Sequence, residues 1–187
     1  EYPYALSKFM GEQACFHWSK VYKVPMISIR IFNAYGPRVR TTGLYGAVFG
    51  VFFKQKLSGK PFTLVGNGNQ KRDFLFVTDV ANAFYMCAIS NKKNKVYNLG
   101  AGAPQSILSL IKILKGKFIK IPKRPGEPNC TWANISKIKK EIKWTPKINF
   151  KEGVNIMLKD INKWKDAPLW NPAKIKNATK TWFKYLS

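Results

Sequence analysis

Apolar and polar residues along this 187-residue chain alternate between the spacing of helices and that of strands. Residues 4–22 place apolar side chains about one helical turn apart, and Pro3 precedes them where a first turn accepts proline, so a helix is predicted. Residues 26–32 are largely apolar and β-branched, which predicts a buried strand that ends in a turn at residues 34–37. A long helix that leads into a buried strand is typical of α/β proteins.

The same patterns predict an alternation of helices and strands as far as Leu114. A Gly-Asn-Gly-Asn sequence separates two short apolar runs, which favours a hairpin-like turn between two strands. Ser106 suits the N-cap of one helix, and either Thr78 or Asp79 suits the N-cap of another. The predicted elements are a helix at 43–57, strands at 62–65 and 73–77, a helix at 80–89, a strand at 96–99 and a helix ending at Leu114.

The C-terminal third is predicted to be rich in helices. No low-complexity linker is found, and residues 115–123 are the most linker-like segment. Apolar positions from Val154 to Ile161 follow the i, i+3, i+4, i+7 spacing of an amphipathic helix. We also expect a short basic helix at 135–142 and a last helix at 172–185.

The chain carries 33 basic and 9 acidic residues, which gives a formal net charge of +24. Such a charge suggests nucleic-acid binding. However, only five basic residues are arginines, the usual readers of bases, and the lysines are scattered singly or in pairs. We therefore expect solvated lysine-rich faces and no nucleic-acid partner, with a positive field that attracts a doubly charged anionic substrate.

Cysteine and histidine usage argues against metal chemistry. Cys15, Cys87 and Cys130 are far apart, and His17 is the only histidine, so we expect no metal site and no Ser-His-Asp triad. The three thiols suggest a reducing compartment. No apolar stretch is long enough to span a bilayer. We expect a cytoplasmic protein that does not associate with a membrane.

The first candidate for chemistry is the pair Tyr4 and Lys8. Residues four apart on a helix share one face. An ammonium beside a phenol favours the phenolate, which makes the tyrosine a usable acid and base. Alone, this spacing is common and weak evidence.

Five further motifs follow Tyr4-x-x-x-Lys8 in a fixed order. They are Arg30-Ile-Phe-Asn-Ala-Tyr-Gly-Pro, Gly66-Asn-Gly-Asn-Gln-Lys-Arg-Asp-Phe, Tyr97-Asn-Leu-Gly, Arg124-Pro-Gly-Glu-Pro and Trp144-Thr-Pro. Over residues 1–165 this series resembles the extended short-chain dehydrogenase/reductase family, in particular its NAD-dependent nucleotide-sugar epimerases and dehydratases. Residues 165–187 lie outside the resemblance.

The resemblance implies roles at the reacting end of the site. Tyr4 would be the acid/base on a sugar hydroxyl, and Lys8 would bind the nicotinamide ribose and favour the Tyr4 phenolate. Phe32 and Tyr35 would lie near the nicotinamide of NAD. Asn33 would contact the substrate.

The resemblance also implies roles at the nucleotide end. Arg72 and Arg124 would hold the diphosphate, for which a planar guanidinium is well suited. Glu127 would bind a ribose hydroxyl. Arg72 has an alternative interpretation, an ion pair with Asp73 or Asp79.

The implied fold is the C-terminal part of a Rossmann-type domain plus a small mixed α/β substrate lobe. Residues 1–40 would end the Rossmann-type domain, and residues 41–187 would form mainly the lobe, with 80–100 returning to the Rossmann sheet. The glycine-rich turn that binds the NAD pyrophosphate in this family is not found here. We therefore interpret the chain as the C-terminal part of a longer protein and expect little turnover from these residues alone.

The implied activity is that of a nucleotide-sugar 4-epimerase, which oxidises sugar C4 transiently. A 4,6-dehydratase or a decarboxylase of the same family is the first alternative. A catalytically inactive module that binds substrate or another protein is the second. The family commonly dimerises through the helix at residues 4–22, so a homodimer is expected.

Overall fold

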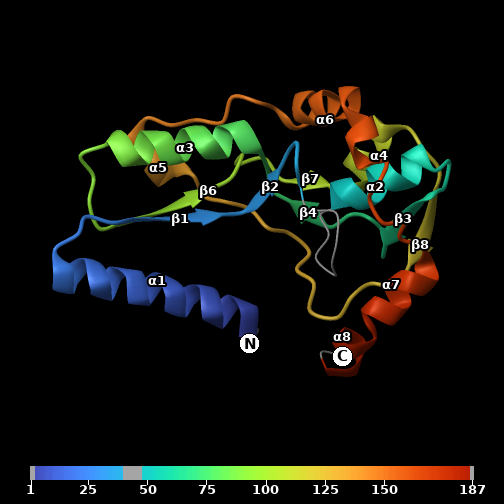
Figure 1. Cartoon of the computed structure of the whole chain (residues 1–187), viewed down its shortest axis with the longest axis horizontal. Coiled ribbons are helices and arrows are strands. Elements are labelled where there is room, and N and C mark those ends of the chain that lie inside the picture. The colour runs from blue at the N-terminus through green and yellow to red at the C-terminus, as the bar shows by residue number, and fades with distance from the viewer. Residues whose placement is uncertain (1–2, 40–47, 186–187) are drawn as a thin grey trace.

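The computed structural model describes residues 3–39 and 48–185, and it is an α/β fold as the sequence predicts (Figure 1). The elements are α1 (Pro3–Tyr22), β1 (Ile27–Ile31), β2 (Asn33–Tyr35), α2 (Val48–Leu57), β3 (Phe62–Val65), β4 (Lys71–Arg72), β5 (Phe74–Phe76), α3 (Val77–Ile89), β6 (Lys95–Leu99), β7 (Gln105–Ser106), α4 (Ile107–Leu114), β8 (Phe118–Ile121), α5 (Ser136–Ile142), α6 (Phe150–Lys159), the 3₁₀ helix η1 (Ile161–Trp164), α7 (Pro172–Ala178) and α8 (Lys180–Tyr185).

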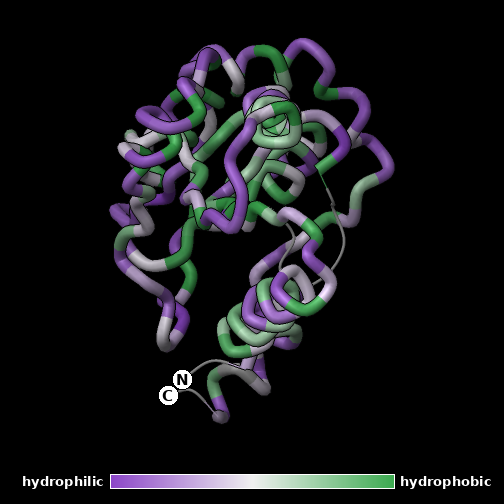
Figure 2. The backbone as a smooth tube through the Cα atoms, turned by 90° about the vertical axis from the view of Figure 1, so that its left-hand side faces the viewer, coloured by the Kyte–Doolittle hydropathy of each residue, from purple (hydrophilic) through white to green (hydrophobic). Residues whose placement is uncertain are grey.

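One layer of the molecule is the parallel pair of β1 and β6, in register from Ile27 opposite Lys95 to Ile31 opposite Leu99. Helix α3 covers one face of this pair, and α1 lies on the other side (Figure 1). In the side view of Figure 2, α1 lies below the sheet and carries hydrophobic as well as polar residues. The expected domain boundary at residues 40 and 41 lies outside the described residues.

The other strands pair between distant parts of the chain. Strand β2 pairs in parallel with β5, β3 pairs in parallel with β8, and β4 pairs antiparallel with β7. The predicted hairpin across residues 66–69 is therefore wrong, because its two strands have different partners. The predicted turn at residues 34–37 is too early, because Ala34 and Tyr35 continue as β2 and the turn follows them.

Two hydrophobic clusters form the core. The larger contains mainly aromatic residues from α2, β2, β3 and β5 together with apolar residues from α4 and α6, and the predicted core phenylalanines Phe62, Phe74 and Phe76 belong to it. The smaller packs β6 against α3 and α5 around Tyr97 and Trp144.

The helix caps agree only in part with the sequence. Ser106 caps α4 as predicted, because its side chain accepts a hydrogen bond from the backbone N–H of Ser109. Neither Thr78 nor Asp79 caps α3, which begins at Val77 without a side-chain cap. The Asp79 carboxylate instead accepts hydrogen bonds from two backbone N–H groups just before α6.

Two further predictions for the C-terminal third are wrong. The expected linker at 115–123 contains β8, whose partner β3 is more than fifty residues away. The expected helix at 172–185 is divided into α7 and α8 at Thr179, whose hydroxyl donates to the carbonyl of Ile175 and competes with helix hydrogen bonding. None of the helices in residues 3–39 and 48–185 combines the length and apolar composition needed to cross a bilayer.

Candidate functional site

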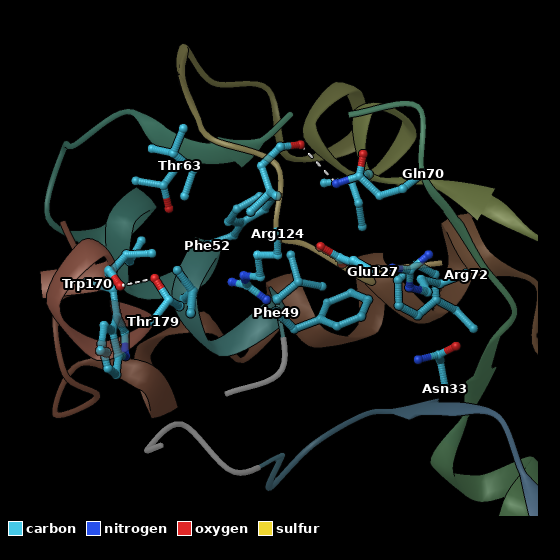
Figure 3. A pocket seen from close by; sticks show the side chains of 18 of the residues that line it. Asn33, Phe49, Phe52, Thr63, Gln70, Arg72, Arg124, Glu127, Trp170 and Thr179 are labelled. Atoms are coloured by element: carbon cyan, nitrogen blue, oxygen red, sulfur yellow. Dashed lines mark hydrogen bonds and ion pairs between the residues drawn. The ribbon is translucent and has the colours of Figure 1, made fainter. Parts of the chain in front are cut away.

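A pocket of about 300 Å³ lies beside the larger hydrophobic cluster. Its walls come from the start of β2, from α2, β3, β4 and β5, from the loop after β8, and from the segment around α7. Most of the lining side chains are apolar. Its charged lining residues are Arg72, Arg124 and Glu127, and they lie between Asn33 at one end and Trp170 and Thr179 at the other (Figure 3).

Arg72 and Glu127 are held together as an ion pair. Nη2 of Arg72 donates to Oε1 of Glu127 at 2.8 Å, and the two side chains are only 12% and 21% exposed. Nη1 of Arg72 donates to the backbone oxygens of Lys71 and Pro128. The sequence placed both residues at the nucleotide end, but the alternative pairing of Arg72 with Asp73 or Asp79 is replaced by the pairing with Glu127.

Arg124 is three residues before Glu127, on the loop that follows β8. Its side chain lies at the centre of the pocket view, near Phe49 (Figure 3). The two guanidinium groups and the apolar walls make a site suited to a molecule with both an anionic and an apolar part.

Asn33 begins β2 at the opposite end of the pocket from Trp170 (Figure 3). Its backbone N–H donates to the carbonyl of Asp73, and its side-chain oxygen accepts from the hydroxyl of Thr131 at 2.9 Å. These contacts fix the Asn33 side chain at the carboxyl end of β1, the edge at which open α/β sheets usually bind ligands.

Asp73 organises the loops behind the site, a role that sequence reasoning missed. Its carboxylate is fully buried and accepts hydrogen bonds from the backbone N–H groups of Ala101, Gly102 and Ala133. A side chain at Gly100 would approach Asp73 Oδ2 to 2.7 Å. The glycines after β6 were the available signal, because glycine allows a backbone to approach a buried carboxylate closely.

Tyr4 and Lys8 lie on one face of α1, as their spacing predicts. Lys8 Nζ is 5.4 Å from the centre of the Tyr4 ring, and the Tyr4 side chain is 70% exposed. Neither residue lines the pocket. Helix α1 is tied to β1 by Glu12, whose carboxylate accepts hydrogen bonds from Ser28 and Arg30.

Phe32 and Tyr35 are placed in the two hydrophobic clusters. Tyr35 is 2% exposed, stacks on Phe49 and donates a hydrogen bond to the carbonyl of Phe150. Burial raises the pKa of the Tyr35 phenol far above its ordinary range. Phe32 is half-buried and packs on the smaller cluster. Tyr35 is therefore part of the larger hydrophobic cluster beside the pocket, and it is not among the residues that line the pocket.

The wall around Trp170 and α7 was not anticipated, because residues 165–187 carry no motif of the resemblance. Gln55, which is 1% exposed, donates hydrogen bonds to the Thr63 hydroxyl and to the Trp170 carbonyl. A polar residue on an otherwise apolar face of the helix at 43–57 was the sequence signal.

Among the described residues, no three His, Cys, Asp or Glu side chains gather as a metal site would require.

Comparisons with known proteins agree on one family. The model of the NAD dependent epimerase/dehydratase family matches residues 1–100. A putative UDP-glucose 4-epimerase of Methanocaldococcus jannaschii is 34% identical over 158 residues, 81% of this chain and 50% of that protein. The uncharacterized UDP-glucose epimerase YtcB of Bacillus subtilis is 32% identical over 161 residues, 81% of this chain and 49% of that protein. The chain spans about half the length of these curated relatives.

Solved structures show the same likeness. The UDP-glucose 4-epimerase of Thermotoga maritima, solved with UDP-glucose, has a TM-score of 0.80 at 26% identity. The match covers 86% of this chain and 53% of the Thermotoga chain. The UDP-glucuronic acid 4-epimerase of Bacillus cereus, solved with UDP-glucuronic acid and NAD, has a TM-score of 0.76 at 31% identity, with coverage of 86% and 52%. Other relatives are a dTDP-glucose 4,6-dehydratase and a UDP-glucuronic acid decarboxylase.

Proposed function

The chain belongs to the NAD-dependent epimerase/dehydratase family, and on that premise we propose that its pocket binds a nucleoside diphosphate sugar for 4-epimerisation. The observation that carries the proposal is the convergence of Arg72, Arg124 and Glu127 in one cavity that has Asn33 at its end. Two guanidinium groups match the charge of a diphosphate, and the apolar walls suit the rest of a nucleotide.

The nucleotide end is assigned to the three charged residues. Arg72 and Arg124 hold the two phosphates, and the ion pair with Glu127 keeps the Arg72 guanidinium in one orientation. Glu127 also presents its carboxylate to a ribose hydroxyl. Asn33 is at the far end, so the sugar that follows the diphosphate lies toward the side chain of Asn33 and the carboxyl end of β1.

The reacting end is assigned to Tyr4 and Lys8. When bound, NAD supplies reversible oxidation at sugar C4. Tyr4 removes the proton of the C4 hydroxyl and returns it after the sugar has turned, while Lys8 binds the cofactor's ribose. The exposed Tyr4 ring and the Lys8 ammonium 5.4 Å from its centre fit the nicotinamide end of NAD. Phe32, which packs on the smaller hydrophobic cluster, is also assigned to the nicotinamide end.

Relatives with dehydratase and decarboxylase activities support an alternative, because all three reactions begin by oxidising the same carbon. Product analysis of the full-length protein with UDP-glucose and NAD separates them. Formation of UDP-galactose supports the 4-epimerase. A 4-keto-6-deoxy sugar supports a dehydratase. A protein that converts none of UDP-glucose, dTDP-glucose and UDP-glucuronic acid would contradict the proposal.

The proposal includes three statements about the assembly. Residues 1–40 end a Rossmann-type domain, 41–187 form mainly the substrate lobe, and 80–100 return to the Rossmann sheet.

The homodimer forms through α1, where Phe9, for example, is 56% exposed. The isolated 187 residues are inactive and act only as a binding module, because their sequence does not contain the glycine-rich turn that binds the NAD pyrophosphate in this family. Sedimentation and turnover measurements on the isolated chain test the last two statements.

A further inference from the structure

The segment from Trp170 to Thr179, which includes α7, forms one end of the pocket, although it lies beyond the residues that carry the family resemblance. The family model matches residues 1–100, and the last family motif begins at Trp144. Trp170, Ile175, Ala178 and Thr179 nevertheless line the same cavity as the arginines. The family motifs therefore give no expectation for the chemistry of this end of the pocket.

Several contacts fix this segment and the residues before it to the pocket floor. The Trp164 ring packs edge-on against Phe53 of α2, with ring centres 4.9 Å apart. Lys54 donates a hydrogen bond to the carbonyl of Lys165. Gln55 donates to the carbonyl of Trp170 at 2.8 Å and, being almost fully buried, cannot exchange that bond for water. The segment is thus an ordered wall of the pocket.

The chemistry of this end differs from that of the middle. Its lining has apolar groups from α7, together with the hydroxyl-bearing residues Thr63 and Thr179, and the charged side chain nearest to this end in Figure 3 is Arg124 at the centre of the pocket. Phosphates need the cations near the centre of the pocket, whereas a flat heterocycle gains from apolar contact with a few polar groups at its edge. Phe52, Val65 and Ile175 are among the apolar residues that line the pocket.

We propose that the wall formed by Trp170, Ile175, Ala178 and Thr179 holds the nucleobase, so that this C-terminal segment determines base affinity. The inference rests on the proposed function, because it takes the diphosphate to lie at Arg72 and Arg124. The base then extends away from Asn33, toward α7.

Calorimetric titration of the full-length protein with UDP and with inorganic pyrophosphate tests the inference. Ile175→Ala removes part of the wall and should weaken UDP binding about three- to tenfold. Ala178→Leu keeps a good helix former but fills the cavity, and should weaken UDP binding by about tenfold or more. Neither variant should change pyrophosphate binding by more than about twofold, because pyrophosphate has no base. Ile89→Ala, at a 66% exposed position ending α3, is the matched control and should change neither affinity.

The outcomes separate this inference from the proposed function. If wild-type protein binds UDP and both wall variants bind it within twofold of wild type, the inference is overturned while the proposed function stands. A parallel loss of pyrophosphate affinity also overturns it, since the wall would then act only through the fold. If wild-type protein binds none of UDP, dTDP, CDP and GDP, the proposed function fails and the inference fails with it.

Discussion

At the scale of single residues, the orientation of Arg72 determines what the centre of the pocket can bind. Its guanidinium donates to two backbone oxygens and to Glu127, each at 2.8 Å. A planar group held on several sides presents its remaining N–H groups in a fixed direction, and a lysine ammonium cannot reproduce this arrangement. The positive charge alone is therefore not sufficient.

Replacing Arg72 with lysine tests this dependence on shape. Arg72→Lys keeps the positive charge but loses the planar guanidinium with its several N–H donors. The affinity for UDP should therefore fall by about tenfold or more in a calorimetric titration. Arg30→Lys is the matched control, because the Arg30 pair with Glu12 lies outside the pocket and should leave UDP binding unchanged. Equal UDP affinities for wild type and Arg72→Lys would contradict the account.

The motifs predicted which residues gather at this site but not how they are paired. Arg72 and Glu127 were assigned separately to a ligand, and the structure also joins them to each other across more than fifty residues. A contact of that kind leaves no local pattern in the sequence. The buried role of Asp73 was missed for the same reason, since its partners follow β6 and precede α5.

At the scale of elements, α6 packs closely on the larger cluster because of Gly153. A side chain there would approach the Tyr35 hydroxyl to 2.1 Å and the Phe76 ring to 2.8 Å. Glycine normally weakens a helix interior, so its presence here reflects the close approach of the helix to the aromatic core.

Gly153→Ala should therefore destabilise the protein by about 1–3 kcal/mol in urea unfolding, despite alanine's higher helix propensity. Gly11→Ala, in the middle of α1 with no neighbouring atom within 4 Å of the added carbon, should instead be neutral or stabilise by up to about 1 kcal/mol. Finding the two changes equally stabilising would refute this packing of α6.

The attachment of α1 to β1 should depend on pH. Hydrogen bonds from Arg30 and Ser28 lower the pKa of Glu12 from 4.5 to about 2. A carboxyl group whose pKa is lower in the folded state than in the unfolded state stabilises the fold fully when the pH is above the unfolded-state pKa. This stabilisation is lost as the pH falls toward the folded-state pKa. The difference in unfolding free energy between wild type and Glu12→Gln should be constant above pH 5 and shrink between pH 4.5 and 2. A constant difference down to pH 3 would rule out this contribution.

Sequence patterns predicted helix α1, strands β1, β3 and β6 and the cap of α4, all of which depend on local periodicity or a single side chain. Several of the errors concern strand pairing. Gly66 suggested a hairpin, but its backbone N–H donates to the carbonyl of Ile121 of β8, so the turn leads from the parallel β3–β8 pair to β4, which pairs with β7. Parallel pairing of distant segments depends on the whole fold and is not encoded by turn residues alone.

At the scale of the whole molecule, two parts of the site come from different parts of the fold. The pocket lies beside the larger core, while Tyr4 and Lys8 lie on α1, across the β1–β6 layer from α3 (Figure 1). Family motifs predict residues in both parts. The C-terminal wall could not be predicted, because it depends on where η1 and α7 pack in three dimensions.

The central claim is that Tyr4 performs the proton transfer while the pocket binds the nucleotide. The most direct test compares Tyr4→Phe with Tyr22→Phe, an exposed tyrosine on the same helix, in the full-length protein with UDP-glucose and NAD. Tyr4→Phe should lower kcat by about a hundredfold or more, with UDP affinity unchanged, and Tyr22→Phe should retain the wild-type kcat. A Tyr4→Phe enzyme with near wild-type kcat would contradict the account.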